Sequence, residues 1–211
     1  SIAARVLFHL RETGFDAWQV TVPMDDSIMS EQTSYLELMY DFNHTRPSEG
    51  KKRSEMLKQM LGSCGENCYI EPPFRANWGG KHLHFGNGVY ANFNLTIVDD
   101  EDIFVGDCVM FGPNVTIATA NHPIEPSLRE KQYQYNKPIR IERNVWIGAN
   151  VTIVPGVTIG ENSVIGAGSV VTKDIPANVV AVGIPCRVMR EIGEHDKEYF
   201  YRDEKIDWEN L

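Results

Sequence analysis

Residues 141–174 read IERNVWIGANVTIVPGVTIGENSVIGAGSVVTKD, and an aliphatic residue returns at every sixth position of this stretch. Similar hexads precede it, with breaks after Ile97 and Ile117. The series has twelve members: Phe85, Ala91, Ile97, Val105, Phe111, Ile117, Ile141, Ile147, Ile153, Ile159, Ile165 and Val171. A short internal repeat of this kind is typical of a β-helix.

The residues three places further along each hexad indicate where the chain turns. Ten of these twelve residues are Gly, Asn or Asp, and the exceptions are Cys108 and Ala120. Gly, Asn and Asp accept a positive φ readily, so each hexad can form a short strand followed by a tight corner. Three hexads make a triangular coil of 18 residues, and twelve make about four coils. We therefore predict a mainly β protein, a parallel β-helix with the repeated residues buried in a narrow column.

The rest of the chain divides around this repeat. We predict an N-terminal helical region over residues 1–66, a β-helix over 67–188 that begins near residues 68–74, and a C-terminal tail over 189–211. Helices are expected before Gly14, over 31–43 and from Pro47 to Gly62. Because Ile117 and Ile141 are 24 residues apart, four times six, residues 123–138 are expected to form a loop that protrudes without breaking the repeat.

Composition excludes several classes of function. A formal net charge of −9 argues against nucleic-acid binding, and no apolar run is long enough to span a membrane. The N-terminal residues do not resemble a signal peptide. The cysteines at positions 64, 68, 108 and 186 are too few and too irregular for a disulfide framework, so we expect reduced thiols and a cytoplasmic protein.

His122 is the strongest candidate for a catalytic residue. It lies directly before the predicted loop, between Asn121 and Pro123. An imidazole titrates near neutral pH, so a histidine at a corner that faces a cleft suits a general base. A structural role for a corner histidine is the alternative.

Motifs along residues 35–205 resemble the galactoside and maltose O-acetyltransferases, which are hexapeptide-repeat enzymes. The resemblance depends on YDFN (40–43), YANFN (90–94), DD (99–100), GPNV (112–115), HP (122–123), NVWIG (144–148), VPGVTIG (154–160), VIGAGSVVTKDIP (164–176) and GIPCR (183–187). It implies a left-handed β-helix, a homotrimer with active sites between subunits, and acetyl-CoA as co-substrate with no metal. The first thirty residues depart from the family pattern.

The resemblance also implies a mechanism, in which neutral His122 removes a proton from a sugar hydroxyl that attacks the acetyl thioester. The backbone N–H of Ala149 would stabilise the oxyanion. Ala167 and Thr172 would contact the cofactor arm and its adenine end, and Lys173, Arg187 and Arg190 would neutralise its phosphates. The residues expected at the acceptor are Asn92, Asp100, Tyr90, Asn77 and Gln134, with Asp25 or Asp26 as a further acidic ligand. Trp146 is expected near the cofactor, at a subunit contact or in the core.

Three other interpretations remain open from the sequence. His82, His84 and His122 supply three imidazoles, as in the zinc site of a γ-type carbonic anhydrase. A xenobiotic acetyltransferase acting on chloramphenicol or streptogramin-type antibiotics would share the histidine base. A catalytically silent β-helix could serve as a scaffold. The joint presence of His122, Lys173 and Arg187 favours the sugar O-acetyltransferase (galactoside, maltose or glucose type).

Overall fold

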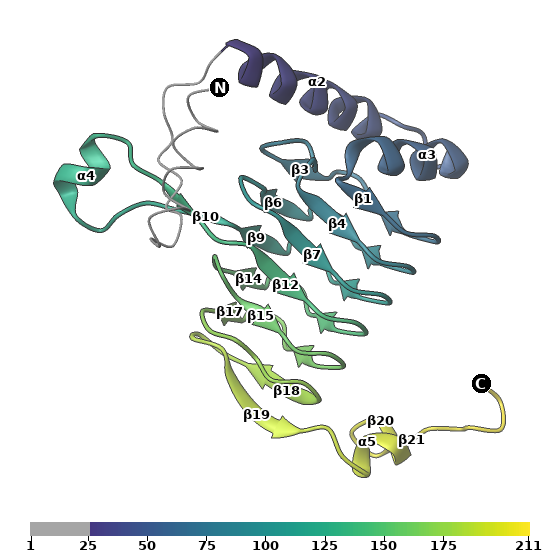
Figure 1. The fold of residues 1–211 in the computed structure, drawn as a ribbon. Coiled ribbons are helices and arrows are strands. Elements are labelled where there is room, and N and C mark those ends of the chain that lie inside the picture. The colour runs from purple at the N-terminus through teal and green to yellow at the C-terminus, as the bar shows by residue number, and fades with distance from the viewer. Residues whose placement is uncertain (1–25) are drawn as a thin grey trace.

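A computed structural model of the protein describes residues 26–211. The helix predicted before Gly14 and the candidate ligand Asp25 lie outside the described residues. Two helices, α2 (Asp26–Asn43) and α3 (Gly50–Met60), lie across one end of a stack of short strands (Figure 1). Both predicted helices are present, although α2 begins five residues before the predicted position and α3 begins after Glu49 rather than at Pro47.

The strands form the three faces of a β-solenoid, and within each face neighbouring coils pair in parallel. Sheet A contains, in spatial order, β1 (Ser63–Cys64), β4 (Leu83–Phe85), β7 (Ile103–Val105), β12 (Ile139–Ile141) and β15 (Thr158–Ile159). Sheet B contains β2 (Tyr69–Ile70), β5 (Tyr90–Ala91), β8 (Met110–Phe111), β13 (Trp146–Ile147), β16 (Val164–Ile165), β18 (Val179–Val182) and the antiparallel β19 (Arg187–Glu191). Sheet C contains β3 (Arg75–Ala76), β6 (Thr96–Val98), β9 (Thr116–Ala118), β14 (Thr152–Ile153) and β17 (Val170–Val171).

The core of the solenoid confirms the hexad pattern. All twelve repeated residues are buried, none of them more than 4% exposed. A second buried series, four places after the first in most hexads, fills the space beneath the corners, and it includes Val89, Leu95, Val109, Val115, Val145, Val151 and Val157. Parallel coils with N-terminal helices are the architecture that the sequence predicts, while the handedness inferred from the family stays a prediction.

The corners follow the prediction at nine of twelve positions, where φ is positive. The three exceptions are Asp100, Ala120 and Asp174, and all three lie where the chain passes from sheet C to sheet A. Cys108 adopts a φ of 58° although it is neither Gly nor Asn. It occupies the same corner as Asn144 and Asn162, whose side-chain amides are hydrogen-bonded to each other at 3.0 Å.

The solenoid begins earlier and is taller than the sequence predicts. Strand β1 already pairs with β4, so the first coil starts at Ser63 rather than near residue 68, and sheets A and C each contain five strands instead of about four. The inward positions of this extra coil are Cys64, Ile70 and Ala76, in register with Phe85, Ala91 and Ile97. These residues are also six apart, but a cysteine and an alanine make a weak hydrophobic signal.

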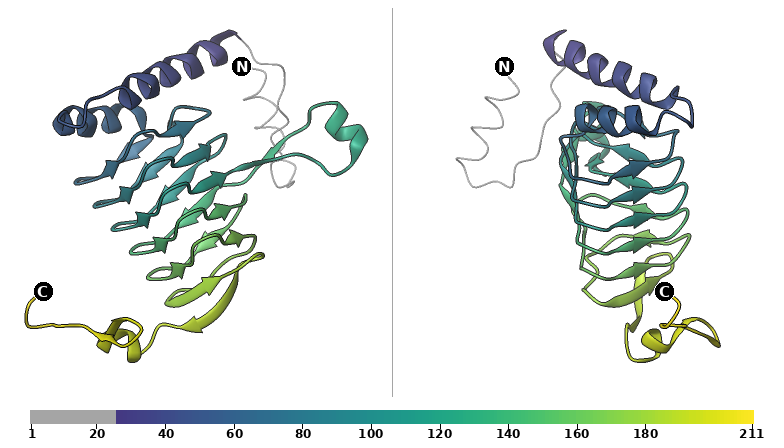
Figure 2. Two further views of the ribbon diagram at one scale, coloured as in Figure 1. Left: turned by 180° about the vertical axis from the view of Figure 1, so that it is seen from behind. Right: turned by 90° about the vertical axis from the view of Figure 1, so that its right-hand side faces the viewer.

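The predicted loop is a hairpin that projects from the stack (Figures 1 and 2). Its base is the antiparallel pair β10 (Ala120–Asn121) and β11 (Tyr135–Asn136), and its tip contains α4 (Pro126–Glu130). The solenoid resumes in register after it, because β12 pairs with β7. The prediction that residues 123–138 leave the repeat without breaking it is therefore confirmed.

The tail occupies the end of the stack opposite the helices (Figure 1). After β19, it forms α5 (His195–Glu198) and a small hairpin of β20 (Tyr199–Tyr201) and β21 (Glu204–Lys205). No helix within residues 26–211 is long and apolar enough to cross a membrane.

Candidate functional site

His122 lies at the base of the protruding hairpin, with its imidazole held in one orientation. Its Nδ1 is 2.9 Å from the carbonyl oxygen of Tyr133 on the returning limb. A carbonyl oxygen can only accept a hydrogen bond, so Nδ1 carries the proton and Nε2 presents a lone pair. The backbone N–H of His122 donates to Asn121 Oδ1 at 2.9 Å, which fixes the turn into the loop. This tautomer is the one that a general base requires.

A cavity of about 510 Å³ opens beside this imidazole. It is formed by the two limbs of the hairpin and is lined by His122, Pro123, Ile124, Glu125, Leu128, Tyr133, Gln134 and Tyr135. Gln134, predicted to orient His122 or the acceptor, lines the same cavity and donates from Nε2 to Asn136 Oδ1 at 2.9 Å. The structure thus places Gln134 beside the same cavity as His122, whereas the contact that orients His122 comes from the Tyr133 carbonyl.

Two predicted acceptor ligands lie on the solenoid edge from which the hairpin emerges, which we call the C–A edge because it joins sheet C to sheet A. Asn77 follows β3 and Asp100 follows β6, in adjacent coils. Asn77 Oδ1 accepts the backbone N–H of Asp99 at 2.7 Å, and Asp100 Oδ1 accepts the indole N–H of Trp78 at 3.1 Å. The two corners form one connected network beside the coil that carries His122.

Three other predicted residues lie on a second edge, the B–C edge, where sheet B joins sheet C. Asn92 follows β5, Ala149 follows β13 and Ala167 follows β16. Within the described chain, the backbone N–H groups of Ala149 and Ala167 have no hydrogen-bond acceptor. These two unpaired donors are spaced one coil apart, and each could bind a carbonyl oxygen.

The predicted phosphate ligands differ in how free their charges are. Lys173 and Thr172 are exposed on the C–A edge directly after β17, and Lys173 makes no ion pair with any described residue. Arg187 is exposed on β19 and donates from Nη1 to the carbonyl oxygen of Cys186. Arg190 forms two hydrogen bonds of 2.7 Å to the carboxylate of Asp196, which lowers the pKa of Asp196 to about 2. Arg190 would have to exchange this partner in order to bind a phosphate.

Tyr90 and Trp146 point outward from sheet B. Their strands lie on either side of β8, and the residue between them in register is Met110. These side chains are 38%, 51% and 47% exposed, so they form an apolar stripe on the surface of the single chain. A core position for Trp146, one of the alternatives open from the sequence, is therefore wrong, because an outward position on a β-strand faces away from the column.

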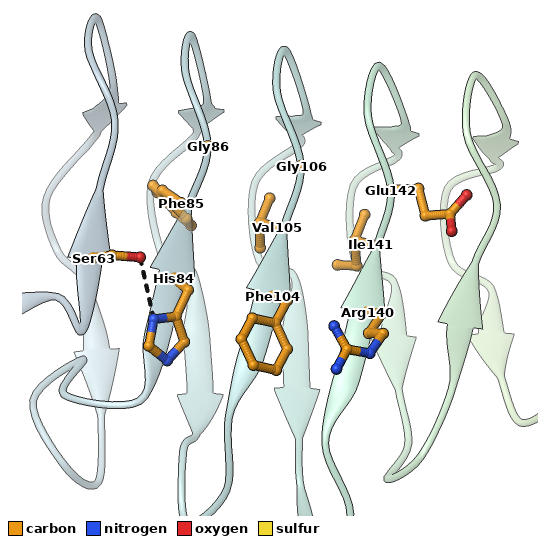
Figure 3. A pocket seen from close by; sticks show the side chains of 10 residues that line it. All are labelled: Ser63, His84, Phe85, Gly86, Phe104, Val105, Gly106, Arg140, Ile141 and Glu142. Carbon is orange, nitrogen blue, oxygen red and sulfur yellow. Dashed lines mark hydrogen bonds between the residues drawn. The ribbon is translucent and has the colours of Figure 1, made fainter.

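The histidines proposed for a zinc site point to different places. His84 lies on the outer face of sheet A, where its Nδ1 meets Ser63 Oγ at 3.1 Å (Figure 3). Its Nε2 meets Asp102 Oδ1 at 2.9 Å. His82 contacts the carbonyl of Asp99, and His122 lies at the hairpin. Among residues 26–211 no three His, Cys, Asp or Glu side chains are grouped to hold a metal. Cys64 and Cys68 are not joined by a third such side chain among these residues, and burial raises the pKa of Cys64 to about 12.

Sequence reasoning missed two features of this site. Asp99 was noted only as part of a motif, yet it is fully buried and binds the neighbouring corner. Trp78 is not among the predicted site residues, yet its indole N–H donates to Asp100. A hydrophobic pattern cannot indicate either contact, because both depend on which corners the coils stack together.

Comparison with known proteins identifies the group to which this fold and site belong. Residues 22–65 match the maltose acetyltransferase hexapeptide capping motif, and residues 138–173 match the six-repeat bacterial transferase hexapeptide. The chain is 57% identical over 185 residues to the galactoside O-acetyltransferase of Lactococcus lactis subsp. lactis (strain IL1403), covering 88% of this chain and 89% of the relative.

Solved structures give the same result. A galactoside acetyltransferase in complex with coenzyme A superimposes with a TM-score of 0.87 at 47% identity, covering 95% of this chain and 98% of that one. A maltose O-acetyltransferase from Clostridium difficile 630 gives a TM-score of 0.81 at 44% identity, covering 84% and 94%. The fold is that of the hexapeptide-repeat acetyltransferases. Within that class, this chain belongs to the galactoside and maltose O-acetyltransferase family.

Proposed function

We propose that this protein transfers the acetyl group of acetyl-CoA directly to a hydroxyl of a sugar of the galactoside, maltose or glucose type, with His122 as general base. The orientation of His122 is the observation that carries the proposal. Since Tyr133 holds the Nδ1 proton, Nε2 is free to accept the hydroxyl proton of the acceptor. Acetyl-CoA-dependent O-acetyl transfer is the chemistry of the family to which the chain belongs.

The transfer balances without a further reactant. The acceptor oxygen loses its proton to Nε2 of His122 and attacks the thioester carbonyl carbon. The unpaired N–H of Ala149 stabilises the oxyanion, since a donor that is already in position costs no reorganisation when the charge develops. The carbon–sulfur bond then breaks, and His122 returns the proton to the sulfur of coenzyme A. The base contributes about 10²- to 10⁴-fold to the rate.

The residues on the described surface fit coenzyme A. Lys173 supplies an ammonium group that has no carboxylate partner in the described part of the chain, and Arg187 supplies a second cation near the end of the stack. Ala167 lies one coil beyond Ala149 on the B–C edge, which suits an extended pantetheine arm, whereas Thr172 is next to Lys173 on the C–A edge. A cytoplasmic location is part of the proposal, because acetyl-CoA is available there.

The site is proposed to form between subunits of a homotrimer. The base is on the C–A edge of a chain, whereas Asn92 and the oxyanion donor are on its B–C edge, and sheet C separates the two edges. A ring of three chains can place the C–A edge of one subunit against the B–C edge of the next. The projecting hairpin and the exposed stripe of Tyr90, Met110 and Trp146 are the surfaces that such contacts would cover.

The reaction is tested by measuring thiol release from acetyl-CoA with galactosides, maltose and glucose as acceptors. We expect one of these sugars to stimulate release and His122→Ala to lower that rate at least about 100-fold. His195→Ala, which removes an exposed histidine of the tail, is the matched control and should retain activity. Stimulation by chloramphenicol but by none of the sugars would instead support a xenobiotic acetyltransferase.

The shared site is tested by complementation between two inactive variants. Co-expression of His122→Ala with Asn92→Ala should restore part of the activity, because some interfaces then combine an intact C–A edge with an intact B–C edge. Neither variant alone can form such an interface. A mixed trimer without activity would contradict a site made by two subunits, and a monomer in light scattering would contradict the trimer.

A further inference from the structure

The corner that carries Asp100 is fixed to the preceding corner by a buried carboxylate. Asp99 is 0% exposed, and its oxygens accept the backbone N–H groups of Trp78 at 2.8 Å, Gly80 at 3.2 Å and His82 at 3.4 Å. Its own N–H donates to Asn77 Oδ1 at 2.7 Å. A carboxylate so fully buried is stable only when its hydrogen-bonding capacity is used, so Asp99 holds residues 77–82 in a single position.

Trp78 is the side chain that this arrangement places over Asp100. Its indole N–H donates to Asp100 Oδ1 at 3.1 Å. The Lys81 ammonium lies 5.3 Å from the centre of the indole ring, and Glu31 of α2 binds that ammonium at 2.7 Å. The His82 ring lies 5.6 Å from the indole at a tilt of 59°. The indole is therefore restrained by its backbone, by a cation and by a second ring.

The indole contact leaves Asp100 with one committed and one available oxygen. Oδ1 is occupied by Trp78, whereas Oδ2 has no partner among the described residues. A carboxylate can accept several hydrogen bonds, so Oδ2 remains able to bind a hydroxyl group. Fixing Oδ1 also removes the rotational freedom that a free carboxylate would lose on binding a ligand, which increases affinity.

We infer that Trp78 is a positioning residue for the acceptor: its indole N–H orients Asp100 so that the free oxygen binds a sugar hydroxyl. This inference rests on the proposed function and on the acceptor role that the family resemblance predicts for Asp100. Trp78 acts through Asp100 and does not need to touch the sugar. The N–H group, rather than the bulk of the ring, is the feature that matters.

The test is a double-mutant cycle on acceptor kinetics. Trp78→Phe keeps an aromatic ring and removes the donor, and we expect kcat/KM for the acceptor to fall about five- to tenfold through a higher acceptor KM, with the KM for acetyl-CoA unchanged. In an Asp100→Ala background the same substitution should cause no further loss. A residue with a purely structural role would give additive losses in the two backgrounds.

A second substitution isolates the N–H group from the shape of the side chain. Replacing Trp78 with 3-benzothienylalanine exchanges the N–H for sulfur at nearly constant volume, so a folding defect is avoided and the same rise in acceptor KM is expected. Asp102→Asn is the matched control, since Asp102 belongs to the same corner but binds His84 on sheet A, and its acceptor KM should not change.

The outcomes separate this inference from the proposed function. If Asp100→Ala raises the acceptor KM but the benzothienyl substitution does not, only the role of Trp78 is overturned. Additive losses of kcat/KM in the double-mutant cycle have the same consequence. An unchanged acceptor KM in Asp100→Ala removes Asp100 from the acceptor site and overturns the inference, while the proposed function stands as long as sugars still stimulate thiol release. If the native chain shows no sugar-stimulated release of thiol from acetyl-CoA, the proposed function itself is contradicted.

Discussion

The solenoid and the hairpin that projects from it are built in opposite ways. In the solenoid, strands pair with neighbours above and below, and the twelve repeated residues are 0–4% exposed. In the hairpin, β10 and β11 pair only with each other among the strands of residues 26–211, and α4 buries no residue. The scaffold therefore holds its own shape, while the hairpin is free to carry a reactive group. Functional residues on loops supported by a rigid scaffold follow the same division of roles.

Removing the hairpin tip should have the largest effect, and it should lower activity without lowering stability. Replacing residues 124–132 with two glycines removes α4 and disturbs the Tyr133 carbonyl that orients His122. We expect kcat/KM to fall by at least about 100-fold, because the base loses its orientation. The Tm should change by less than about 2 °C, because nothing in the core is lost. A large fall in Tm, measured by circular dichroism, would show that the hairpin supports the scaffold.

A cavity in the solenoid core tests whether the stability of the protein depends on the scaffold rather than on the hairpin. Phe111→Ala removes a ring that is 1% exposed, and we expect a loss of about 3–5 kcal/mol in the free energy of unfolding. The corresponding fall in Tm is roughly 10 °C. Phe200→Ala is the control, since that ring in the tail is 67% exposed and should change the Tm little. Equal effects of the two substitutions would contradict a single packed column.

Replacing Cys108 with asparagine should show that this corner accepts the same residue as the corners at Asn144 and Asn162 in the neighbouring coils. Cys108 has a φ of 58°, a conformation that costs an ordinary L-residue about 1–2 kcal/mol and that asparagine tolerates. Cys108→Asn should therefore raise the free energy of unfolding by up to about 1 kcal/mol and extend the side-chain ladder that begins at Asn144. Cys108→Ala removes the thiol but keeps the strain, so it should bring no gain in thermal unfolding.

The smallest effect is expected in the tail. The pKa of Asp196 is about 2 because Arg190 binds its carboxylate, so the ion pair stabilises the fold above the ordinary aspartate pKa. This stability is lost as the pH falls from about 4 toward 2. The pair is partly exposed, so Asp196→Asn should cost at most about 1 kcal/mol at pH 7. The difference in Tm should shrink as the pH approaches 2 and vanish only well below it, and a difference that does not shrink over this range would exclude the ion pair as its cause.

Much of the fold could be predicted from the sequence because each hexad contains both the apolar residue that is buried and the residue that forms the corner. Ile147 predicts a buried strand residue and Asn150 predicts a corner with positive φ, and both predictions can be made from the hexad alone. The early coil escaped prediction because Cys64 and Ala76 carry little hydrophobic signal, and their burial depends on Phe85 and Ile97 in the next coil. The corner at Asp100 departed from the pattern because Ile97 and Val105 are eight residues apart rather than six. The corner at Ala120 departed from it because the chain leaves the solenoid there to form the hairpin.

The candidate site was predicted residue by residue, but not as an arrangement. His122, Asp100 and Asn92 were named from motifs, while the Tyr133 carbonyl, the buried Asp99 and the indole of Trp78 were not identified as parts of the site. Arg190 was expected to be a free cation, and the structure pairs it with Asp196. Pairwise contacts between residues far apart in the chain leave no periodic trace in the sequence.

The sequence by itself determined the repeat, the phase of the coils across the inserted loop and the family, and it singled out His122 as the candidate base. These properties are local, since they depend on hydrophobic period, corner chemistry and short motifs. Only the tertiary structure decided which nitrogen of His122 is free, which oxygen of Asp100 is available and which edge carries each ligand. Those properties depend on the stacking of coils, because hydrogen-bond partners are set by neighbours in space and not by neighbours in the chain.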